Sequence, residues 1–389
     1  MKKIVCCLVA LSLLFALAGC GSMDETDSRE FPEENEEISS IQEPVVHQDP
    51  ISLTESDVQI TRQDLSIKND DGTILINIYY DLVQLPDTND SFRAINAGFQ
   101  EEFNSFKSIL DEIREYGYDT AAESSYQQRS TDWHPYEDTY TASVSYCSDG
   151  LLSVTYDTTW NMGGVGNGDR YGLVYNYING EKYTLEALEK NLPPNGNLKE
   201  YVDSKVIWYL EDNKERTDDA VRYMGECTLS DYDICIEDKQ IILLTHNYGI
   251  ARGPRRIPLD LYIDTIGNES EKPFKDVQWD GINRASLDEA DYMPIMSLNS
   301  DGSFVLWGAY SASDAGNVLE GTYSLEKGIV SFKGSRSSNY VSEWKDVDVQ
   351  GTYQLACIGD CVQLTQVDED LMYGAFPAGT VWTFRTYEQ

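Results

Sequence analysis

The sequence predicts an α+β fold in which helices pack on an antiparallel sheet in two α/β subdomains, followed by a C-terminal all-β, barrel-like domain. Several segments before residue 265 alternate apolar and polar residues with a two-residue period, and others repeat apolar residues every three or four positions. Residues 280–389 contain many short strand-like runs separated by turns, which is typical of a small barrel or sandwich. We therefore expect domains at 56–265 and 280–389.

The composition excludes several classes of function. The 389 residues include 67 acidic and 29 basic side chains, for a formal charge of −38, whereas phosphate binding needs clustered Lys and Arg. We therefore expect no nucleic-acid partner. Only three histidines are present, which argues against a site with several histidine ligands, and we expect no metal and no cofactor. So acidic a surface favours cationic partners outside the cell. The alternative is that the charge only keeps the protein soluble.

The first 19 residues have the pattern of a lipoprotein signal peptide. Two lysines precede an apolar run over residues 4–17, which is too short for a confident membrane span. The run ends in Leu-Ala-Gly-Cys20, which resembles a bacterial lipobox, so we expect a lipid on Cys20 that anchors the protein at the extracytoplasmic face of the cell membrane. An ordinary secretory signal with an incidental cysteine is the alternative. Residues 20–55 are rich in acids and are expected to form a disordered tether.

The folded part is expected to begin with two strands, at residues 58–65 and 73–85. They are joined by an Asn-Asp-Asp-Gly turn at 69–72, since Asn, Asp and Gly tolerate a positive φ. That turn lacks the carboxylate spacing of an EF-hand, so a calcium site is not expected. Apolar residues then recur every three or four positions from Phe92 to Ile113, which predicts an amphipathic helix packed on the sheet and closed by Gly117.

The same two patterns continue to residue 263. They predict strands at 139–146, 151–160, 171–178, 234–236, 240–245 and 257–263, and helices at 184–188 and 198–210. A glycine-rich run at 161–168 leads into a strand, whereas a phosphate cradle opens a helix. We expect this run to be a loop between strands.

Five cysteines follow the lipobox, in a compartment that is expected to be oxidising. Cys357 and Cys361 flank a three-residue loop between two strand-like runs, so a disulfide across this hairpin is plausible. A disulfide between Cys227 and Cys235 could close a second small loop, and Cys147 would then have no disulfide partner. Zinc binding is the alternative, but no Cys-x-x-Cys pair occurs.

Three short motifs carry a resemblance to a known family. The motif residues are Gly163 and Gly164 in the first, Asn176, Gly180, Lys182, Thr184 and Leu185 in the second, and Tyr248, Ile250, Ala251 and Gly253 in the third. With them, residues 56–265 resemble the extracellular domain-of-unknown-function family of RsiV-like anti-sigma factors and PdaC-like deacetylases. The first motif departs from the family, because Val165 and Gly166 stand where Ala-His is usual. Any role of that histidine is therefore absent here.

The resemblance implies an α+β domain and two possible settings. RsiV-like members bind lysozyme, a strongly basic protein, and the acidity of this chain suits such a partner. A lipobox replaces the cytoplasmic segment and spanning helix of RsiV, so signal relay of that kind is not implied. No deacetylase domain accompanies the family domain, so PdaC chemistry is not implied either.

The C-terminal pattern is similar to small lipocalin-like lipoprotein domains. Strands are expected at 295–298, 303–310, 321–325, 329–333, 351–356, 362–366 and 380–385. Such a barrel could hold a small apolar ligand or be filled by side chains. Trp307, Trp344 and Trp382 could line a pocket or stack on a sugar, with an aromatic core as the alternative.

No motif specifies catalysis. The chain lacks a Gly-x-Ser-x-Gly elbow, and with 67 acids the proximity of carboxylates in the sequence selects none of them. We therefore expect a non-catalytic binding module at the cell envelope, which recognises a lysozyme-like cationic protein or cell-wall glycan. The alternatives are an accessory subunit or enzyme of glycan processing, and a carrier of a small apolar ligand in the barrel.

Overall fold

The structure is a computed structural model. It describes residues 51–129, 131–164, 166–215, 218–246, 253–264, 277–282, 295–307, 317–338, 347–368 and 378–386. The described residues belong to one compact unit, Pro50–Gln389. The predicted signal peptide, Cys20 and most of the acidic tether lie outside them. Within the described residues, no helix combines the length and the apolar character needed to cross a bilayer.

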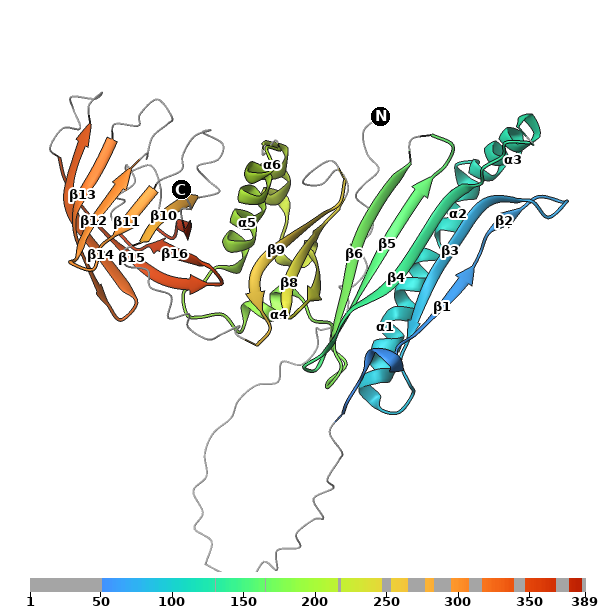
Figure 1. Ribbon diagram of the computed structural model, residues 1–389, viewed down its shortest axis with the longest axis horizontal. Coiled ribbons are helices and arrows are strands. Elements are labelled where there is room, and N and C mark those ends of the chain that lie inside the picture. The colour runs from blue at the N-terminus through green and yellow to red at the C-terminus, as the bar shows by residue number, and fades with distance from the viewer. Residues whose placement is uncertain are drawn as a thin grey trace, which may run out of the picture. The chain divides into compact units, whose positions relative to one another are not determined.

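The first sheet has six strands. They are β1 (Gln59–Asp64), β2 (Ile67–Lys68), β3 (Ile74–Gln84), β4 (Tyr136–Ser148), β5 (Leu151–Asn161) and β6 (Asn167–Asn176), after the 3-10 turn η1 (Glu55–Asp57). Their order is β1-β3-β4-β5-β6, with β2 beside β3 (Figure 1). The predicted antiparallel sheet contains one parallel pair, β3 and β4. Three helices form the crossover that a parallel pair requires.

These helices are α1 (Asp90–Phe106), α2 (Ile109–Glu115) and α3 (Tyr118–Gln128), where the sequence predicted one helix. Asn89 caps α1, since its side chain accepts a hydrogen bond from the N–H of Phe92 at 2.8 Å. The apolar stripe of α1 packs on the sheet as predicted, and α1 ends at Phe106. Gly117 has φ +69°, so it turns the chain between α2 and α3. Only Ala122 of α3 is buried, which explains why its periodic signal was weak.

A second, three-stranded sheet contains β7 (Asp233–Glu237), β8 (Gln240–Thr245) and β9 (Arg255–Tyr262). Its helices are α4 (Leu185–Glu189), α5 (Leu198–Asp212) and α6 (Asp218–Glu226), with the 3-10 turn η2 (Leu229–Asp231). This sheet lies directly against β6: a Cβ atom on Gly172 would come within 2.1 Å of the carbonyl oxygen of Ile234. Only glycine permits that approach.

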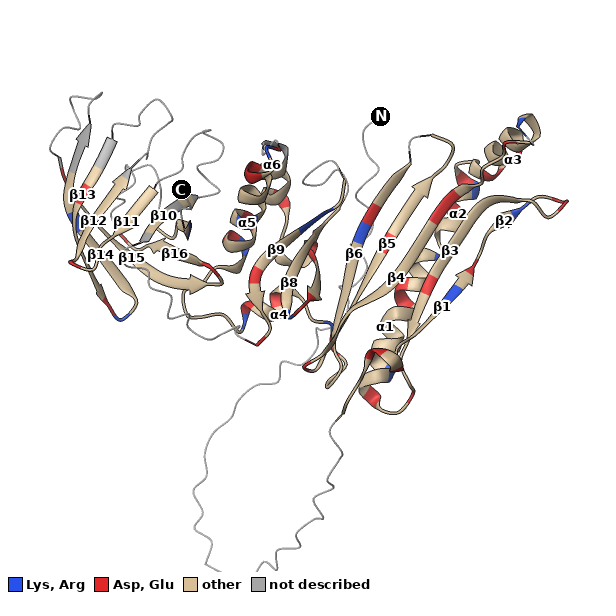
Figure 2. Ribbon diagram, in the orientation of Figure 1, with Lys and Arg blue, Asp and Glu red and all other residues tan. Residues whose placement is uncertain are grey.

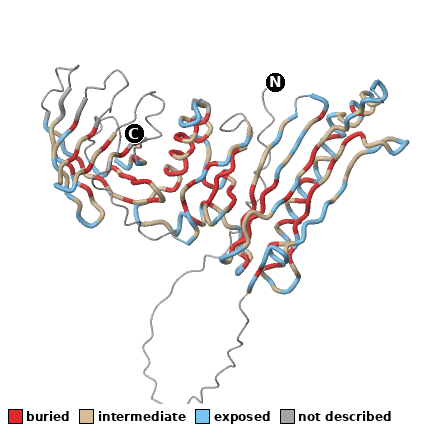
Figure 3. The backbone as a smooth tube through the Cα atoms, in the orientation of Figure 1, coloured by how far each residue is buried: buried red, intermediate tan, exposed pale blue. Residues whose placement is uncertain are grey.

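Helix α5 is buried on several sides rather than along one stripe (Figure 3). Nine of its fifteen residues are buried, including the polar side chains Asp203 and Ser204. The helix contacts β9, α6 and the barrel strand β17 (Val381–Thr386). It therefore carries the packing between the second sheet and the C-terminal domain.

The C-terminal domain is a closed, antiparallel, eight-stranded barrel, as predicted. Besides β17, its strands are β10 (Val277–Ile282), β11 (Ile295–Leu298), β12 (Ser303–Trp307), β13 (Asn317–Glu326), β14 (Ile329–Ser338), β15 (Val347–Ile358) and β16 (Cys361–Gln366). Strand β10 was not predicted, because it begins before residue 280, where the C-terminal domain was expected to start. It closes the barrel by pairing with both β11 and β17.

Large side chains occupy the described interior of the barrel. Trp279, Phe304, Tyr353, Trp382 and Phe384 are each at most 1% exposed. Trp382 is thus part of an aromatic core, while Trp344 and the side chain of Trp307 lie outside what the structure describes. This filling favours a packed core over a carrier of a small apolar ligand.

Candidate functional site

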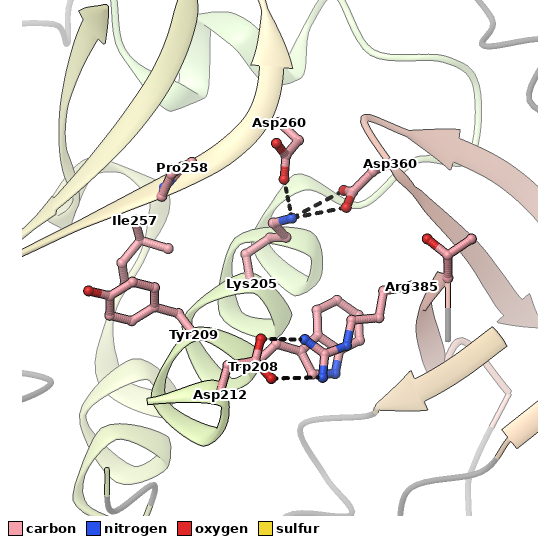
Figure 4. A pocket seen from close by; sticks show the side chains of 10 residues that line it. Lys205, Trp208, Tyr209, Asp212, Ile257, Pro258, Asp260, Asp360 and Arg385 are labelled. Carbon is pink, nitrogen blue, oxygen red and sulfur yellow. Dashed lines mark hydrogen bonds and ion pairs between the residues drawn. The ribbon is translucent and has the colours of Figure 1, made fainter. Parts of the chain in front are cut away.

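A pocket of about 650 Å³ lies where α5 and β9 meet the barrel (Figure 4). Ligand sites commonly form at such junctions, and their volumes fall in this range. Its lining residues are Lys205, Trp208, Tyr209, Asp212, Ile257, Pro258, Asp260, Asp360, Arg385 and Thr386. The lining thus combines two cations, three carboxylates and two large aromatic side chains.

Helix α5 supplies one wall of the pocket. Asn197 caps the helix by accepting a hydrogen bond from the N–H of Glu200 at 3.0 Å. Lys205, Trp208 and Asp212 follow at spacings of three and four residues, which places them on one face. Tyr209 stands beside them at the pocket.

Strand β9 supplies the second wall through a bulge. The pairing of β8 with β9 shifts register between Gln240 and Ile242, and Asp260 has φ +53°, which is unusual for a residue other than glycine. A bulge can turn a side chain away from its regular direction, and strained backbone often marks functional positions. Here Asp260 accepts hydrogen bonds from the ammonium of Lys205 and from Nε2 of Gln240, the latter at 3.0 Å.

The third wall is the tip of the β15–β16 hairpin. Asp360 accepts a hydrogen bond from Nζ of Lys205 at 3.1 Å and another from the hydroxyl of Tyr201 at 3.3 Å. That hydroxyl also lies against the carbonyl of Leu259 in β9. Ile358 and Cys361, at the ends of the two strands, are buried in the same core as α5. The hairpin is therefore anchored to the second sheet and its helix.

A second anchor links the same two regions. The side chain of Gln363 is fully buried, accepts a hydrogen bond from the N–H of Asn197 at 2.8 Å and donates one to the carbonyl of Asn197 at 2.9 Å. Its Nε2 also contacts Oγ1 of Thr383 at 3.1 Å. Buried, satisfied polar groups of this kind fix one arrangement. The pocket therefore has walls held in a defined geometry.

Gly359 permits the close approach of the hairpin, and Gly359→Ala is expected to disturb it. Its φ is +55°, and a Cβ atom would lie 2.5 Å from the hydroxyl oxygen of Tyr201 and 2.9 Å from the carbonyl oxygen of Asp260. We expect a loss of about 2–3 kcal/mol in the free energy of unfolding, measured by urea denaturation. The control Gly328→Ala has φ +77° but nothing within 4 Å, so it should lose only about 1 kcal/mol. Equal losses would contradict a tight contact at Gly359.

The charges of the pocket are mutually compensated. Burial opposes the charged form of Lys205, but the neighbouring Cys361, Asp360 and Asp260 raise the pKa of its ammonium above the ordinary value. Burial likewise opposes the charged form of Asp360, and the charge of Lys205 lowers its pKa overall. Lys205 therefore stays protonated, and it cannot serve as a nucleophile or a base at neutral pH.

Arg385 of β17 forms the second charged group. Its guanidinium donates to both carboxylate oxygens of Asp212, at 2.9 and 3.3 Å, and lies over the ring of Trp208 with Cζ 5.0 Å from the centroid. Trp208 is 2% exposed, and its Nε1 is buried without a hydrogen-bond partner in the described part of the chain. The arrangement offers donors, acceptors and an aromatic surface, which suits binding of a polar ligand.

The described residues contain no group of three or more His, Cys, Asp or Glu side chains placed to hold a metal ion. His246 lies between two carboxylates of the described residues. Its Nδ1 lies 3.3 Å from Asp169 of β6 and its Nε2 lies 3.2 Å from Asp233 of β7. Hydrogen bonds to Asp169 and Asp233 raise the pKa of His246 to about 10, so the ring is a charged link between the two sheets rather than a base.

The family-motif residues lie away from the pocket lining and shape a turn. Asn176 ends β6, where its Oδ1 accepts a hydrogen bond from the N–H of Ile178 at 2.9 Å. Gly180 has φ +80°, and a Cβ atom there would come within 2.9 Å of the carbonyl oxygen of Ser91. Lys182 forms a β-bridge with Tyr175. The motif therefore specifies a tight turn packed on α1.

The other motif positions are also structural where the structure describes them. Thr184 caps α4 by accepting a hydrogen bond from the N–H of Ala187 at 3.3 Å, and Leu185 is fully buried. Gly163 has φ +82° and faces Tyr136, whose hydroxyl oxygen would lie 2.2 Å from a Cβ atom. The loop after β5 also contains Gly164, and Gly253 precedes β9 with φ +87°. Tyr248, Ile250 and Ala251 lie outside the described residues.

The structure does not contain the expected disulfides. Ile358 pairs with Cys361 and Cys357 with Val362, so the turn has two residues rather than three, and the two cysteines point to opposite faces of the hairpin. Cys235 is buried with Ile242 and Leu244 on one face of the second sheet, whereas Cys227 packs against the core on the other face. Geometry therefore separates both pairs.

Cys147 is likewise a thiol, and burial raises its pKa to about 11. A thiol with so high a pKa is unreactive at neutral pH. The cysteines therefore contribute packing in the structure.

Sequence reasoning missed the pocket residues. It identified helix 198–210 by its apolar members and noted Asp360 only as part of a turn. Lys205 and Asp360 are 155 positions apart, so no local pattern connects them. Helix 198–210 also contains Asp203 and Ser204, so Lys205 does not stand out from the other polar positions of the helix in the sequence.

Comparisons with known proteins found matches among solved structures. No family model and no curated protein matches the chain. A member of the DUF3298 family from Bacteroides fragilis NCTC 9343 aligns with a TM-score of 0.37 and 14% identity, over 54% of this chain and 92% of that chain. A DUF3298 family protein from Pseudomonas aeruginosa PAO1 aligns with a TM-score of 0.32 and 14% identity, over 52% of this chain and 88% of that chain. These structural neighbours thus belong to a family named for its unknown function.

Proposed function

We propose that this protein is a lipid-anchored binding module of the cell envelope and that its pocket binds fragments of cell-wall glycan. The observation that carries the proposal is the pocket lining, which combines compensated cations and carboxylates with Trp208 and Tyr209. Sugar hydroxyls both donate and accept hydrogen bonds, so they suit such a mixed set. The peptide stems of cell-wall glycan carry both signs of charge and suit it as well.

Two features of the sequence support the envelope setting. The Leu-Ala-Gly-Cys20 tetrapeptide resembles a lipobox, and residues 56–265 resemble the extracellular RsiV-like and PdaC-like domains. The pairing of Lys205 with Asp260 and Asp360 favours binding over glycan-processing chemistry, because the charge of Lys205 lowers the pKa of the Asp360 carboxyl, whereas a general acid needs a raised one.

Cys20→Ser is expected to release the protein from the membrane. Acyl chains hold a lipoprotein on the bilayer, and serine provides no thioether link. Fractionation of cells that express the two forms, followed by immunoblotting, should show the wild type in the membrane pellet and the variant in the soluble fraction. A variant that stays in the pellet would contradict anchoring through Cys20.

Cosedimentation with purified peptidoglycan tests the ligand. The purified protein should pellet with intact sacculi at both 50 and 300 mM NaCl, since hydrogen bonding and aromatic contact persist in salt. Soluble N-acetylated oligosaccharide should compete for this binding. Binding that disappears at 300 mM NaCl would be attraction between charges, and no binding at either concentration would contradict the proposal.

A cationic protein such as lysozyme is the second candidate partner. The formal charge of −38 favours it, and Figure 2 shows acidic positions spread over helices and strands of the described residues. Calorimetric titration with lysozyme at low and at 150 mM salt distinguishes the cases. Micromolar binding that persists at 150 mM supports specific recognition, whereas binding that salt abolishes is non-specific.

A further inference from the structure

We infer that Trp208 is a ligand-contacting residue of the pocket, that Arg385 is a displaceable cover on it, and that its ligand is an N-acetylated amino sugar. The inference rests on the proposed function and names the group that recognises the glycan. It also predicts a movement of one side chain on binding.

The indole N–H of Trp208 lacks a hydrogen-bond acceptor in the described part of the chain. Trp208 lines the pocket and is only 2% exposed, yet its buried Nε1 has no hydrogen-bond partner in the described part of the chain. Buried tryptophan N–H groups usually find an acceptor, and an exception calls for an explanation. A ligand oxygen that enters from the pocket would supply the acceptor.

Arg385 covers this indole, and its ion pair with Asp212 is easy to exchange. Its guanidinium lies 5.0 Å from the ring centroid and is held by Asp212, whose side chain is 61% exposed. Trp208 and Asp212 are four residues apart on α5, so one side chain of β17 spans both. Ion pairs with so exposed a partner contribute little to stability. The hydrogen bonds of Gln363 and of Lys205 have other partners, so movement of Arg385 off the indole would leave them in place.

The chemistry of the uncovered surface selects the ligand. With Arg385 moved away, it would present one N–H donor and a flat aromatic face, with Tyr209 in the same pocket lining. An N-acetylated amino sugar offers an amide carbonyl for the N–H and an apolar C–H face for the ring. Its hydroxyls can donate to Asp212 once Arg385 has moved away.

Tryptophan fluorescence and calorimetry with the trisaccharide of N-acetylglucosamine test this assignment. In the wild type, the sugar should change the emission and the acrylamide quenching, and the change should be absent in Trp208→Phe. Trp208→Phe should weaken binding at least tenfold, whereas the control Trp160→Phe, a partly exposed tryptophan of β5, should keep the wild-type affinity. Arg385→Ala should expose Trp208 to acrylamide without sugar and should tighten binding, because the cover no longer has to move.

The outcomes separate the inference from the proposed function. Trisaccharide binding with unchanged affinity in Trp208→Phe would overturn the role of Trp208 and leave the pocket as a glycan site. Absence of trisaccharide binding by the wild type would overturn the inferred ligand, and the proposed function would fall with it only if sacculi also failed to bind. If Trp208→Phe does not fold, the second variant still tests the inference. Acrylamide quenching in Arg385→Ala that equals the wild type would overturn the assignment of Arg385 as a cover on Trp208.

Discussion

Lys205→Met is expected to lower the free energy of unfolding by about 3 kcal/mol. The side chain of Lys205 is 13% exposed, and its ammonium lies between the side chains of Asp260 and Asp360, which are 37% and 31% exposed. Without it, the carboxylates of Asp260 in β9 and Asp360 in the β15–β16 turn would repel each other beside a buried tyrosine. Removing one partner of a buried ion pair typically costs 3–5 kcal/mol, and the partial exposure of both carboxylates places this case at the lower end. Urea denaturation at pH 7 measures the change.

Lys239→Met is the matched control. Lys239 also bridges two aspartates, Asp149 at 3.7 Å and Asp264 at 3.3 Å, but its side chain is 45% exposed. Exposed pairs contribute about 0–1 kcal/mol, so the control should lose less than 1 kcal/mol. Similar losses in the two variants would contradict the special position of Lys205 at the junction with the barrel.

Asp138→Asn is expected to stabilise the protein above pH 7 and to leave it almost unchanged at pH 4. Asp138 of β4 is 3% exposed, and its Oδ2 is buried without a hydrogen-bond partner in the described residues. Burial, with a smaller effect of Glu112, raises the pKa of this carboxyl to about 7 from 3.8. The folded state thus holds the proton more tightly than the unfolded state.

The sign of the pH dependence follows from this difference. The contribution of Asp138 to stability is complete below about pH 3.8 and is lost as the pH rises through 7. The difference between the unfolded pKa of 3.8 and the folded pKa of about 7 corresponds to a loss of about 4 kcal/mol at most in the free energy of unfolding. We expect Asp138→Asn to recover about 2 kcal/mol of it at pH 8, since the amide is still buried. Urea denaturation at pH 4 and pH 8 measures it.

Asp81→Asn provides the contrast within the same sheet. Asp81 is also buried, but it accepts hydrogen bonds from Arg62 at 3.1 Å and from the N–H of Ala142 at 3.3 Å. The amide would weaken both bonds, so this variant should lose stability at pH 8. A gain in Asp81→Asn, or an equal change in Asp138→Asn at both pH values, would contradict the difference between the two aspartates.

Local patterns predicted most elements of this fold because each pattern reports a nearby structure. The alternating residues within 73–85 form β3, and the aromatic stripe from Phe92 forms the buried face of α1. The short C-terminal runs form strands of the barrel. Helix α3 was missed because it buries little, and β10 because its residues follow a polar segment.

The pocket could not be predicted in this way, since its walls come from distant parts of the chain. Asn197 and Gln363 are 166 positions apart, and the bulge that turns Asp260 toward Lys205 has no sequence signature. The family motifs pointed elsewhere, because residues such as Gly180 and Thr184 are required by a turn and a helix cap. Motif residues of this kind preserve a fold, whereas the pocket depends on packing between parts.

Calorimetric titration of a soluble peptidoglycan fragment tests most directly whether the pocket beside α5 is the binding site. The wild type and two variants would be compared: Tyr209→Ala, which removes an aromatic side chain from the pocket lining, and Tyr116→Ala, which removes an exposed one at the end of α2. We expect binding by the wild type and by Tyr116→Ala, and at least a tenfold weaker affinity for Tyr209→Ala, or about 1.4 kcal/mol. Equal affinities in all three proteins would contradict a binding site in this pocket.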